Sequence, residues 1–156
     1  MRIVGHGSVW FTPEVASRVL ELMKLQCSAT RSSYQAIHKH ELSGNAVKQH
    51  VKRRYFPELN QRYVADAVML AGMIQQEGAI FGGRRAWEQL QTGTLSRVDW
   101  QALRNARLYS RGDRTKKGNP NLRLEGDRLF VNDPAKRGRW IEGRLFIPSK
   151  WKPDLS

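Results

Sequence analysis

The hydrophobic pattern of this chain changes its period near residue 111, and that change constrains the fold more than any other feature of the sequence. Before it, apolar residues recur at helical spacing, for example at Leu59, Tyr63, Ala67, Leu70, Ala71 and Ile74. After it, they alternate with polar residues, at Leu122, Leu124, Leu129 and Val131. The first period predicts helices and the second predicts strands. We therefore predict an α+β protein, mostly helical before about residue 110 and mostly antiparallel strands after about residue 120.

Local signals divide the helical part. Thr12-Pro13-Glu14 combines a hydroxyl cap, a proline at the first helical position and an acid at the positive end of the helix dipole. A helix should run from there to about His40, either continuous or broken between residues 28 and 33. Further helices are predicted over residues 45–55, 57–77, 84–90 and, after a Ser96-Arg97-Val98-Asp99 capping box, to about Tyr109. Two inward faces are expected, the first with Ala16, Val19, Leu20, Met23, Cys27, Tyr34 and Ile37, and the second with Ala46, Val47, His50 and Val51.

The rest of the chain has the texture of short strands. Residues 122–131 predict a hairpin around Glu125-Gly126-Asp127. Two more strand-like runs flank Glu142-Gly143 and end at Pro148, and residues 2–4 and 9–11 could add an edge strand. The expected organisation is therefore a β segment at residues 1–11, a helical region at 12–110 and a β region at 111–156.

The charge of the chain points to a polyanionic partner. Its 27 Lys and Arg residues outnumber its 14 Asp and Glu residues, which gives a formal net charge of +13. Such a charge repels itself unless it meets a dense polyanion, and nucleic acid is the leading candidate. An anionic membrane is the weaker alternative, because the sequence has no apolar run long enough to span a bilayer and no signal peptide pattern. A cytoplasmic protein is expected, and its single cysteine, Cys27, excludes an internal disulfide and favours a core role.

A basic, glycine-punctuated segment, Tyr109 to Asn121, is the strongest candidate contact with phosphates. Cationic side chains and bare backbone N–H groups can approach a polyanion closely there. A solvated basic linker is the alternative interpretation, and it is the commoner one for an isolated charge run. The candidate contacts in and beside this segment are Arg111, Arg114, Lys116, Lys117 and Asn119.

Three other groups of residues could extend this contact. Arg104 and Arg107 precede Arg111 at i, i+3 and i+7 spacing, which would align all three on one side of the last helix. Lys48, Lys52, Arg53 and Arg54 form a helix face and its end, and as an isolated feature would more often be a solvated face. The third group joins charge to an aromatic ring that could stack on an unpaired base or belong to the core: Lys136, Arg137, Arg139 and Trp140.

Three segments carry a resemblance to a known family. They are Phe81-Gly82-Gly83-Arg84-Arg85, residues 104–119, and residues 140–148, which read Trp-Ile-Glu-Gly-Arg-Leu-Phe-Ile-Pro. In this order they resemble the amino-terminal half of TnpB-like, OrfB-type transposon proteins, which are similar to compact type V CRISPR effectors. The resemblance covers most of the chain, and the basic segment is its most specific part. It implies a helical recognition lobe with a small, barrel-like antiparallel β wedge domain that grips guide RNA.

The family's activity is RNA-guided DNA cleavage, but its catalytic part has no counterpart in this sequence. A RuvC-like nuclease domain with three carboxylates, and commonly a zinc ribbon of cysteine pairs, follows the wedge in that family, whereas this sequence reaches Ser156 where that half would begin. We expect no catalytic residue, metal site or cofactor on this chain, with Mg²⁺ bound only by a RuvC-bearing partner chain. Asp113, Asp127 and Asp133 should be turn formers or ion-pair partners, and the histidines structural, with His38 or His40 as alternative RNA contacts.

Two functions follow from these expectations. In the first, the chain is the non-catalytic half of an RNA-guided DNA endonuclease and binds guide RNA and the RNA–DNA heteroduplex formed with target DNA. In the second, it is a stand-alone RNA- or DNA-binding accessory, or a decayed transposon protein. Either would work in a prokaryotic cytoplasm, associated with the nucleoid when bound to DNA.

Overall fold

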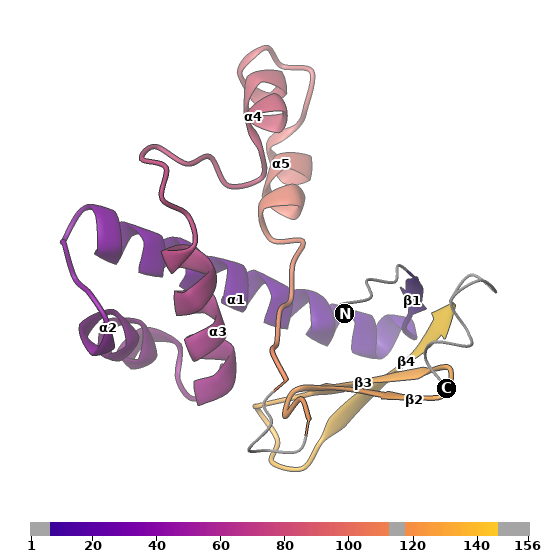
Figure 1. Cartoon of the computed structure of the whole chain (residues 1–156). Helices are drawn as coiled ribbons and strands as arrows, with labels where there is room; N and C mark the ends of the chain where they lie inside the picture. Colours follow the sequence, from indigo (N-terminus) through magenta and orange to yellow (C-terminus); the bar gives the residue numbers. More distant parts are fainter. Residues whose placement is uncertain (1–6, 113–117, 147–156) are drawn as a thin grey trace, which may run out of the picture. The chain divides into compact units, whose positions relative to one another are not determined.

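The computed structural model describes residues 7–112 and 118–146, and these form a mixed α+β structure (Figure 1). Helices α1 (Pro13–His38), α2 (Asn45–Tyr55), α3 (Gln61–Gly72), α4 (Arg84–Gln91) and α5 (Arg97–Arg104) follow a first short strand, β1 (Ser8–Trp10). Strands β2 (Leu122–Glu125), β3 (Arg128–Asn132) and β4 (Trp140–Phe146) follow the helices. The predicted change from helices to strands is confirmed.

The chain divides into two compact units. The sheet unit contains residues 1–19 and 112–156, and the helical unit contains residues 20–111. The first boundary falls inside α1, eight residues beyond the predicted end of the N-terminal β segment, and the second falls within the basic segment, one residue after the predicted start of the β region. Each unit has its own core, and each is described separately below.

Helix α1 is continuous, and its buried stripe differs from the predicted one. In the helical unit the buried positions are Leu22, Gln26, Ala29, Ser33, Tyr34 and Ala36, whereas Leu20, expected inside, is 62% exposed. The prediction missed part of this stripe because two of its buried side chains, Gln26 and Ser33, are polar. Gln26 and Ser33 can be buried because each side chain bonds to a backbone carbonyl, of Tyr63 at 3.2 Å and of Ala29 at 2.8 Å.

Helices α3 and α5 are shorter than predicted, and α2 buries a different face from the predicted one. Helix α3 begins only after Asn60, whose side chain accepts a hydrogen bond from the Tyr63 N–H at 3.0 Å and so caps the first turn. The Ser96 cap of α5 is confirmed by the 3.1 Å bond from the Asp99 N–H, but the helix ends at Arg104. On α2 the bounds agree, yet Ala46 and His50 are exposed, because Val47, Val51 and Tyr55 form the buried stripe.

The sheet is antiparallel throughout, with strand order β1-β4-β3-β2. The predicted hairpin is present, since β2 and β3 pair from Leu122 with Val131 to Glu125 with Arg128. Strand β1 is an edge strand, as expected for residues 9–11, whereas residues 2–4 lie outside the described part. Closing a barrel requires the two edge strands to pair with each other. Within the described residues β1 and β2 do not pair, so this sheet is open and the barrel-like expectation is not supported.

Strand β4 runs without interruption through Glu142 and Gly143, where two separate runs were predicted. Gly143 does not mark a turn. It leaves room for the Phe11 ring, because a Cβ built on Gly143 would lie 2.5 Å from Phe11 Cε1. The missing side chain thus lets an aromatic ring lie directly on the strand.

We expect Gly143→Ala to lower the free energy of unfolding by about 1–3 kcal/mol, because the ring of Phe11 must move away from the new methyl group. Thermal unfolding followed by circular dichroism measures the change. Gly72→Ala is the matched control, since a Cβ at Gly72 meets nothing within 4 Å, and it should be neutral or slightly stabilising. Equal melting temperatures for the two variants would contradict this account of Gly143.

A buried carboxylate joins the first turns of α1 to the end of β3 within the sheet unit. Asp133 is 1% exposed, and its Oδ1 accepts hydrogen bonds from Arg18 Nε at 3.0 Å and Nη2 at 2.9 Å. Burial alone would raise the pKa of Asp133, but the hydrogen bonds from Arg18 and the Ala135 N–H, with the charges of Arg18 and Arg139, lower it below its usual value. This pair therefore stabilises the fold above the unfolded-state pKa and stops doing so as the pH falls through the lower folded-state value. The ion-pair interpretation of Asp133 and of Asp127, which lies 3.8 Å from Arg144, is confirmed, and Asp113 lies outside the described residues.

Candidate nucleic-acid interface

The segment that leads from α5 to the basic loop is extended and lies along α1 in the helical unit. Arg31 donates to the Arg104 carbonyl at 3.2 Å and to Asn105 Oδ1 at 3.0 Å. Next, the Cys27 thiol donates to the Arg107 carbonyl at 3.3 Å. Gln26 then bonds Tyr109 in both directions, with its Nε2 2.8 Å from the carbonyl and its Oε1 2.7 Å from the N–H. Later residues of the segment thus bond to earlier residues of α1. These bonds take the place of the backbone hydrogen bonds that residues 105–109 would make if they were helical.

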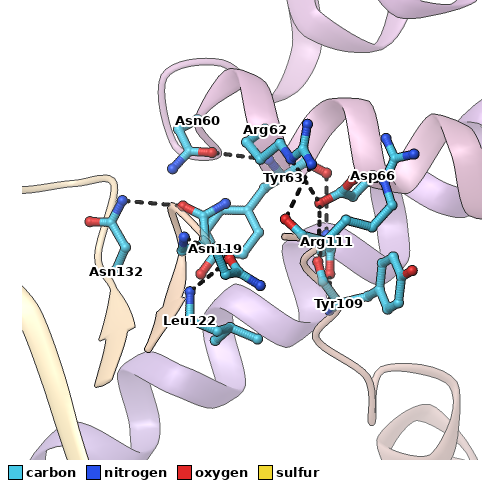
Figure 2. A network of polar contacts seen from close by, with 11 residues as sticks. Asn60, Arg62, Tyr63, Asp66, Tyr109, Arg111, Asn119, Leu122 and Asn132 are labelled. Carbon is cyan, nitrogen blue, oxygen red and sulfur yellow. Dashed lines mark hydrogen bonds and ion pairs between the residues drawn. The ribbon is translucent and has the colours of Figure 1, made fainter. Parts of the chain in front are cut away.

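The last residue of this segment is fixed by a buried carboxylate of α3. Asp66 is fully buried, and it accepts hydrogen bonds from the Arg111 N–H at 3.1 Å and from Arg111 Nε at 2.8 Å (Figure 2). Arg62 lies one turn earlier on α3, with its Nε 3.7 Å from Asp66 and its Nη2 donating to the Arg111 carbonyl at 3.1 Å. The Arg111 guanidinium, expected to contact phosphates, is therefore engaged within the protein, although its side chain is 40% exposed.

Arg104, Arg107 and Arg111 do not line one side of a helix. Because α5 ends at Arg104, only the first of them is helical, and the i, i+3, i+7 spacing has no meaning beyond it. The Arg104 guanidinium lies 4.5 Å from the ring of Trp100, while Arg107 is exposed. The three side chains remain in the helical unit, but on a turn of helix and an extended segment that follows it.

The cations of α2 lie at its surface. Lys48, Arg53 and Arg54 are exposed, and Lys52 is half-buried with its Nζ 5.4 Å from the Phe56 ring centroid. Arg54 is similarly placed 5.6 Å from the ring of Tyr55. Lys52, Arg53 and Arg54 lie in the last turn, where their charges also interact favourably with the helix dipole. The exposed faces remain open to a polyanion.

The remaining predicted residues belong to the sheet unit or lie outside the described part. Asn119 accepts hydrogen bonds from the N–H groups of Asn121 and Leu122, at 2.9 Å and 3.0 Å, and so shapes the entry to β2 (Figure 2). Lys136, Arg137 and Arg139 are exposed in the turn between β3 and β4, with Arg139 Nε 3.8 Å from buried Asp133. Arg114, Lys116 and Lys117 lie outside the described residues.

One face of the sheet carries aromatic rings and arginines, most of which were not predicted from the sequence as binding residues. Residues that pair across antiparallel strands share a face, and so do alternate residues along a strand. The register therefore puts Trp10, Arg144, Arg128 and Glu125 in one row, Phe130, Arg123 and Glu142 in the next, and Trp140 with Asn132 in a third. We call the following set the aromatic–arginine face: Trp10, Arg123, Arg128, Phe130, Trp140, Arg144 and Phe146. The alternation of apolar and polar residues along the strands could have revealed this face, because the arginines occupy its polar positions.

The aromatic–arginine face is open to solvent, whereas the opposite face holds the core. Trp10 is 58% and Phe146 57% exposed, while Val131 and Ile141 on the other face are 2% exposed. Trp140 is half-buried, with the Arg123 guanidinium 4.5 Å from its ring centroid.

The arginines of this face share it with two carboxylates, Glu125 opposite Arg128 and Glu142 opposite Phe130. Arg128 and Arg144 are directly opposite each other, an arrangement of like charges that destabilises a sheet. Arg128 lies 3.2 Å from Glu142 and Arg144 3.8 Å from Asp127, but all four side chains are more than half exposed, and exposed pairs of this kind contribute little. A bound phosphate could therefore compete for either guanidinium.

The histidines, the acidic side chains and the helices of the described ranges bear on two other expectations. Within residues 7–112 and 118–146, no three His, Cys, Asp or Glu side chains come together as a metal site would require. His38 is structural, because its Nε2 lies 3.1 Å from the Ile74 carbonyl and its ring 4.3 Å from that of Tyr34. None of the described helices combines the length and the apolarity needed to cross a bilayer.

A protein-family model described as the SSO2105 N-terminal domain matches residues 3–156, which is nearly the whole chain. The chain belongs to this family. Comparison with curated proteins and with solved structures finds no match. The candidate interface of this SSO2105 N-terminal domain family member is therefore defined by its own geometry.

Proposed function

We propose that this chain binds RNA, and that the aromatic–arginine face is a principal contact. The single observation that carries the proposal is the alternation of exposed rings with arginines on the open face of a small antiparallel sheet. Aromatic rings stack on unpaired bases of any identity, and arginines neutralise the phosphates between them. A net charge of +13 gives the long-range attraction.

The resemblance to TnpB-like proteins makes this proposal more specific. In it, the sheet unit acts as a wedge that grips guide RNA, and the helical unit acts as a recognition lobe for the RNA–DNA heteroduplex. The chain then supplies binding without catalysis, and a separate RuvC-bearing chain cuts the target DNA. Binding by charge and shape leaves sequence selection to base pairing. Exposed cations on α2 and in the turn between β3 and β4 support a wide, sequence-tolerant contact.

The paired arginines give the sharpest test. We expect Arg128→Ala/Arg144→Ala to weaken binding of a single-stranded RNA by about 10- to 100-fold at physiological salt. It should also reduce the slope of log K against log salt by about 1.4, because each lost phosphate contact on a single strand contributes about 0.7. Fluorescence anisotropy with a labelled RNA, measured in EDTA across a salt series, gives both quantities.

A control of equal charge separates a site from a general attraction. Arg84→Ala/Arg97→Ala removes the same two charges from exposed positions on α4 and α5. The proposal requires this control to bind RNA with nearly the wild-type slope. If both double variants lost the same affinity and slope, binding would depend on net charge alone and the aromatic–arginine face would not be the site.

Adding target DNA separates the wedge and recognition-lobe roles from simple RNA binding. A guide-binding protein should hold an RNA–DNA heteroduplex at least as tightly as DNA duplex of the same length, because A-form geometry is what it reads. A preference for plain single strands over the heteroduplex would favour an accessory RNA-binding role.

A further inference from the structure

A second aromatic and cationic site lies in the helical unit, and it includes Arg31, His38 and Arg104. It is a pocket of about 620 Å³ between the end of α1, the loop after α3, and helices α4 and α5. That volume is typical of small-molecule sites. Four aromatic residues line it, namely Tyr34, Phe81, Trp87 and Trp100.

The walls of this pocket are fixed before any ligand arrives. The buried Tyr34 hydroxyl donates to the Gln76 carbonyl at 2.6 Å and accepts from the Ala79 N–H at 3.1 Å, which ties the loop to α1. The Phe81 ring contacts the Tyr34 ring edge-on, with 5.4 Å between their centroids. The rings of Trp87 on α4 and Trp100 on α5 pack together, also with 5.4 Å between centroids. Fixed aromatic walls lower the entropy lost when a flat ring system binds.

Positive charge dominates the polar part of the lining. Arg31, Lys39 and Arg104 contribute three cations, against a single carboxylate, Glu77. No ion pair joins Arg31 or Arg104 to a carboxylate within residues 7–112 and 118–146. Burial and the nearby charge of Arg104 lower the pKa of Arg31, and an anion placed here would favour the charged guanidinium.

Two polar atoms of the pocket also lack a partner. The Nε1 of Trp100, a residue that is 8% exposed, and the Nε of Arg104 are buried without a hydrogen bond in the described structure. Unsatisfied buried donors are uncommon in folded proteins.

From these observations we infer that the pocket binds one nucleoside phosphate, its base against Trp87 and the neighbouring rings and its phosphate at Arg31, Arg104 and Lys39, and that this nucleotide is an unpaired residue of a bound RNA strand. The inference rests on the proposed function and makes it more specific: the sheet unit holds the strand, and the helical unit captures a single base. A base in a duplex cannot enter, because its flat faces are covered by its neighbours.

Trp87 is the side chain with which to test the pocket, because it is 36% exposed and so is accessible to a base. Base stacking on an aromatic side chain is worth enough that Trp87→Ala should weaken a labelled 12-nucleotide single-stranded RNA about 5- to 150-fold. Trp87→Phe should keep most of the affinity, and a blunt RNA duplex of the same length should be insensitive to either change. Circular dichroism checks that each variant is folded.

Lys39→Ala supplies the charge arm of the test, with Lys24→Ala as its matched control. Both lysines are exposed on or just after α1, but only Lys39 lines the pocket. Lys39→Ala should reduce the salt slope for the single strand by about 0.7, and Lys24→Ala should leave it unchanged. Cross-linking with RNA that contains 4-thiouridine should label peptides that carry Phe81 or Trp87.

The outcomes separate this inference from the proposed function. If wild-type protein binds RNA but Trp87→Ala binds equally well and cross-links fall elsewhere, the pocket inference is overturned and RNA binding stands. If wild-type protein binds no RNA, the proposed function fails, and titration with AMP or UMP, followed by tryptophan fluorescence, decides the pocket. Quenching that depends on Trp87 would then make it a site for a free nucleotide, and no quenching would remove the site altogether.

Discussion

Asp66→Ala is expected to destabilise the helical unit more than any other single change considered for this chain, by about 2–4 kcal/mol. The variant leaves the Arg111 N–H without its acceptor and removes the carboxylate that Arg111 and Arg62 share. Breaking a fully buried pair costs about 3–5 kcal/mol, but the Arg111 side chain is 40% exposed and can recover hydration, which lowers the expected cost. Thermal unfolding should show a fall of more than about 5 °C in the melting temperature.

Asp127→Ala is the matched control for Asp66→Ala. It removes another ion-paired aspartate, but one whose side chain is 65% exposed, so its effect should stay within about 0.5 kcal/mol. Asp66→Asn keeps the shape without the charge and should fall between the two. Similar melting temperatures for Asp66→Ala and Asp127→Ala would show that the Asp66 network does not hold the helical unit together.

The basic segment should give the largest effect on binding. Changing Arg114, Lys116 and Lys117 together to Ala should weaken RNA binding by about two orders of magnitude and reduce the salt slope by about 2, since three phosphate contacts are lost. Stability should hardly change, because Lys and Arg are rarely buried and substitutions of exposed cations usually contribute less than about 0.5 kcal/mol each. Arg111 is left intact on purpose, because its bond to Asp66 would mix a folding defect with a binding defect.

A variant that loses three positive charges outside the basic segment is the control for this prediction. Lys24→Ala/Arg84→Ala/Arg97→Ala removes three exposed cations from the helices and should leave most of the affinity in place. An unchanged affinity and slope in the basic-segment variant would reduce that segment to a linker. Unfolding of that variant would instead make it a structural element.

The sequence predicted the elements of the fold better than their ends. The bounds of α2 follow from the Gly44 break and the apolar spacing, and the hairpin of β2 and β3 follows from the Gly126 turn. The end of α5 could not be read locally. Its helical spacing continues to Tyr109, but Gln26, Cys27 and Arg31, some 73 to 83 positions earlier, supply the hydrogen bonds that hold this segment extended. Long-range polar contacts of this kind leave no periodic signal.

The sequence predicted some residues of the candidate site, but little of how they are arranged in space. Charge and aromatic content indicated a nucleic-acid partner, and Trp140 was singled out together with the cations before it. Arg111 shows the limit, because nothing in its neighbourhood along the chain reveals a buried aspartate 45 positions earlier. Trp10 and Arg144 show it again, since only the register of β1 with β4 makes them neighbours.

The division of the chain has a consequence for its biosynthesis. The helical unit is one continuous stretch, residues 20–111, whereas the sheet unit joins the first residues to the last ones. On the ribosome the helical unit can therefore fold as soon as it emerges, while β1 must wait for β4 before it finds a partner. Prior folding of the helices shortens the flexible chain that has to close, which lowers the entropic cost of that late pairing. The nascent protein thus acquires the aromatic–arginine face last, and its exposed rings come together only after residue 146 has been made.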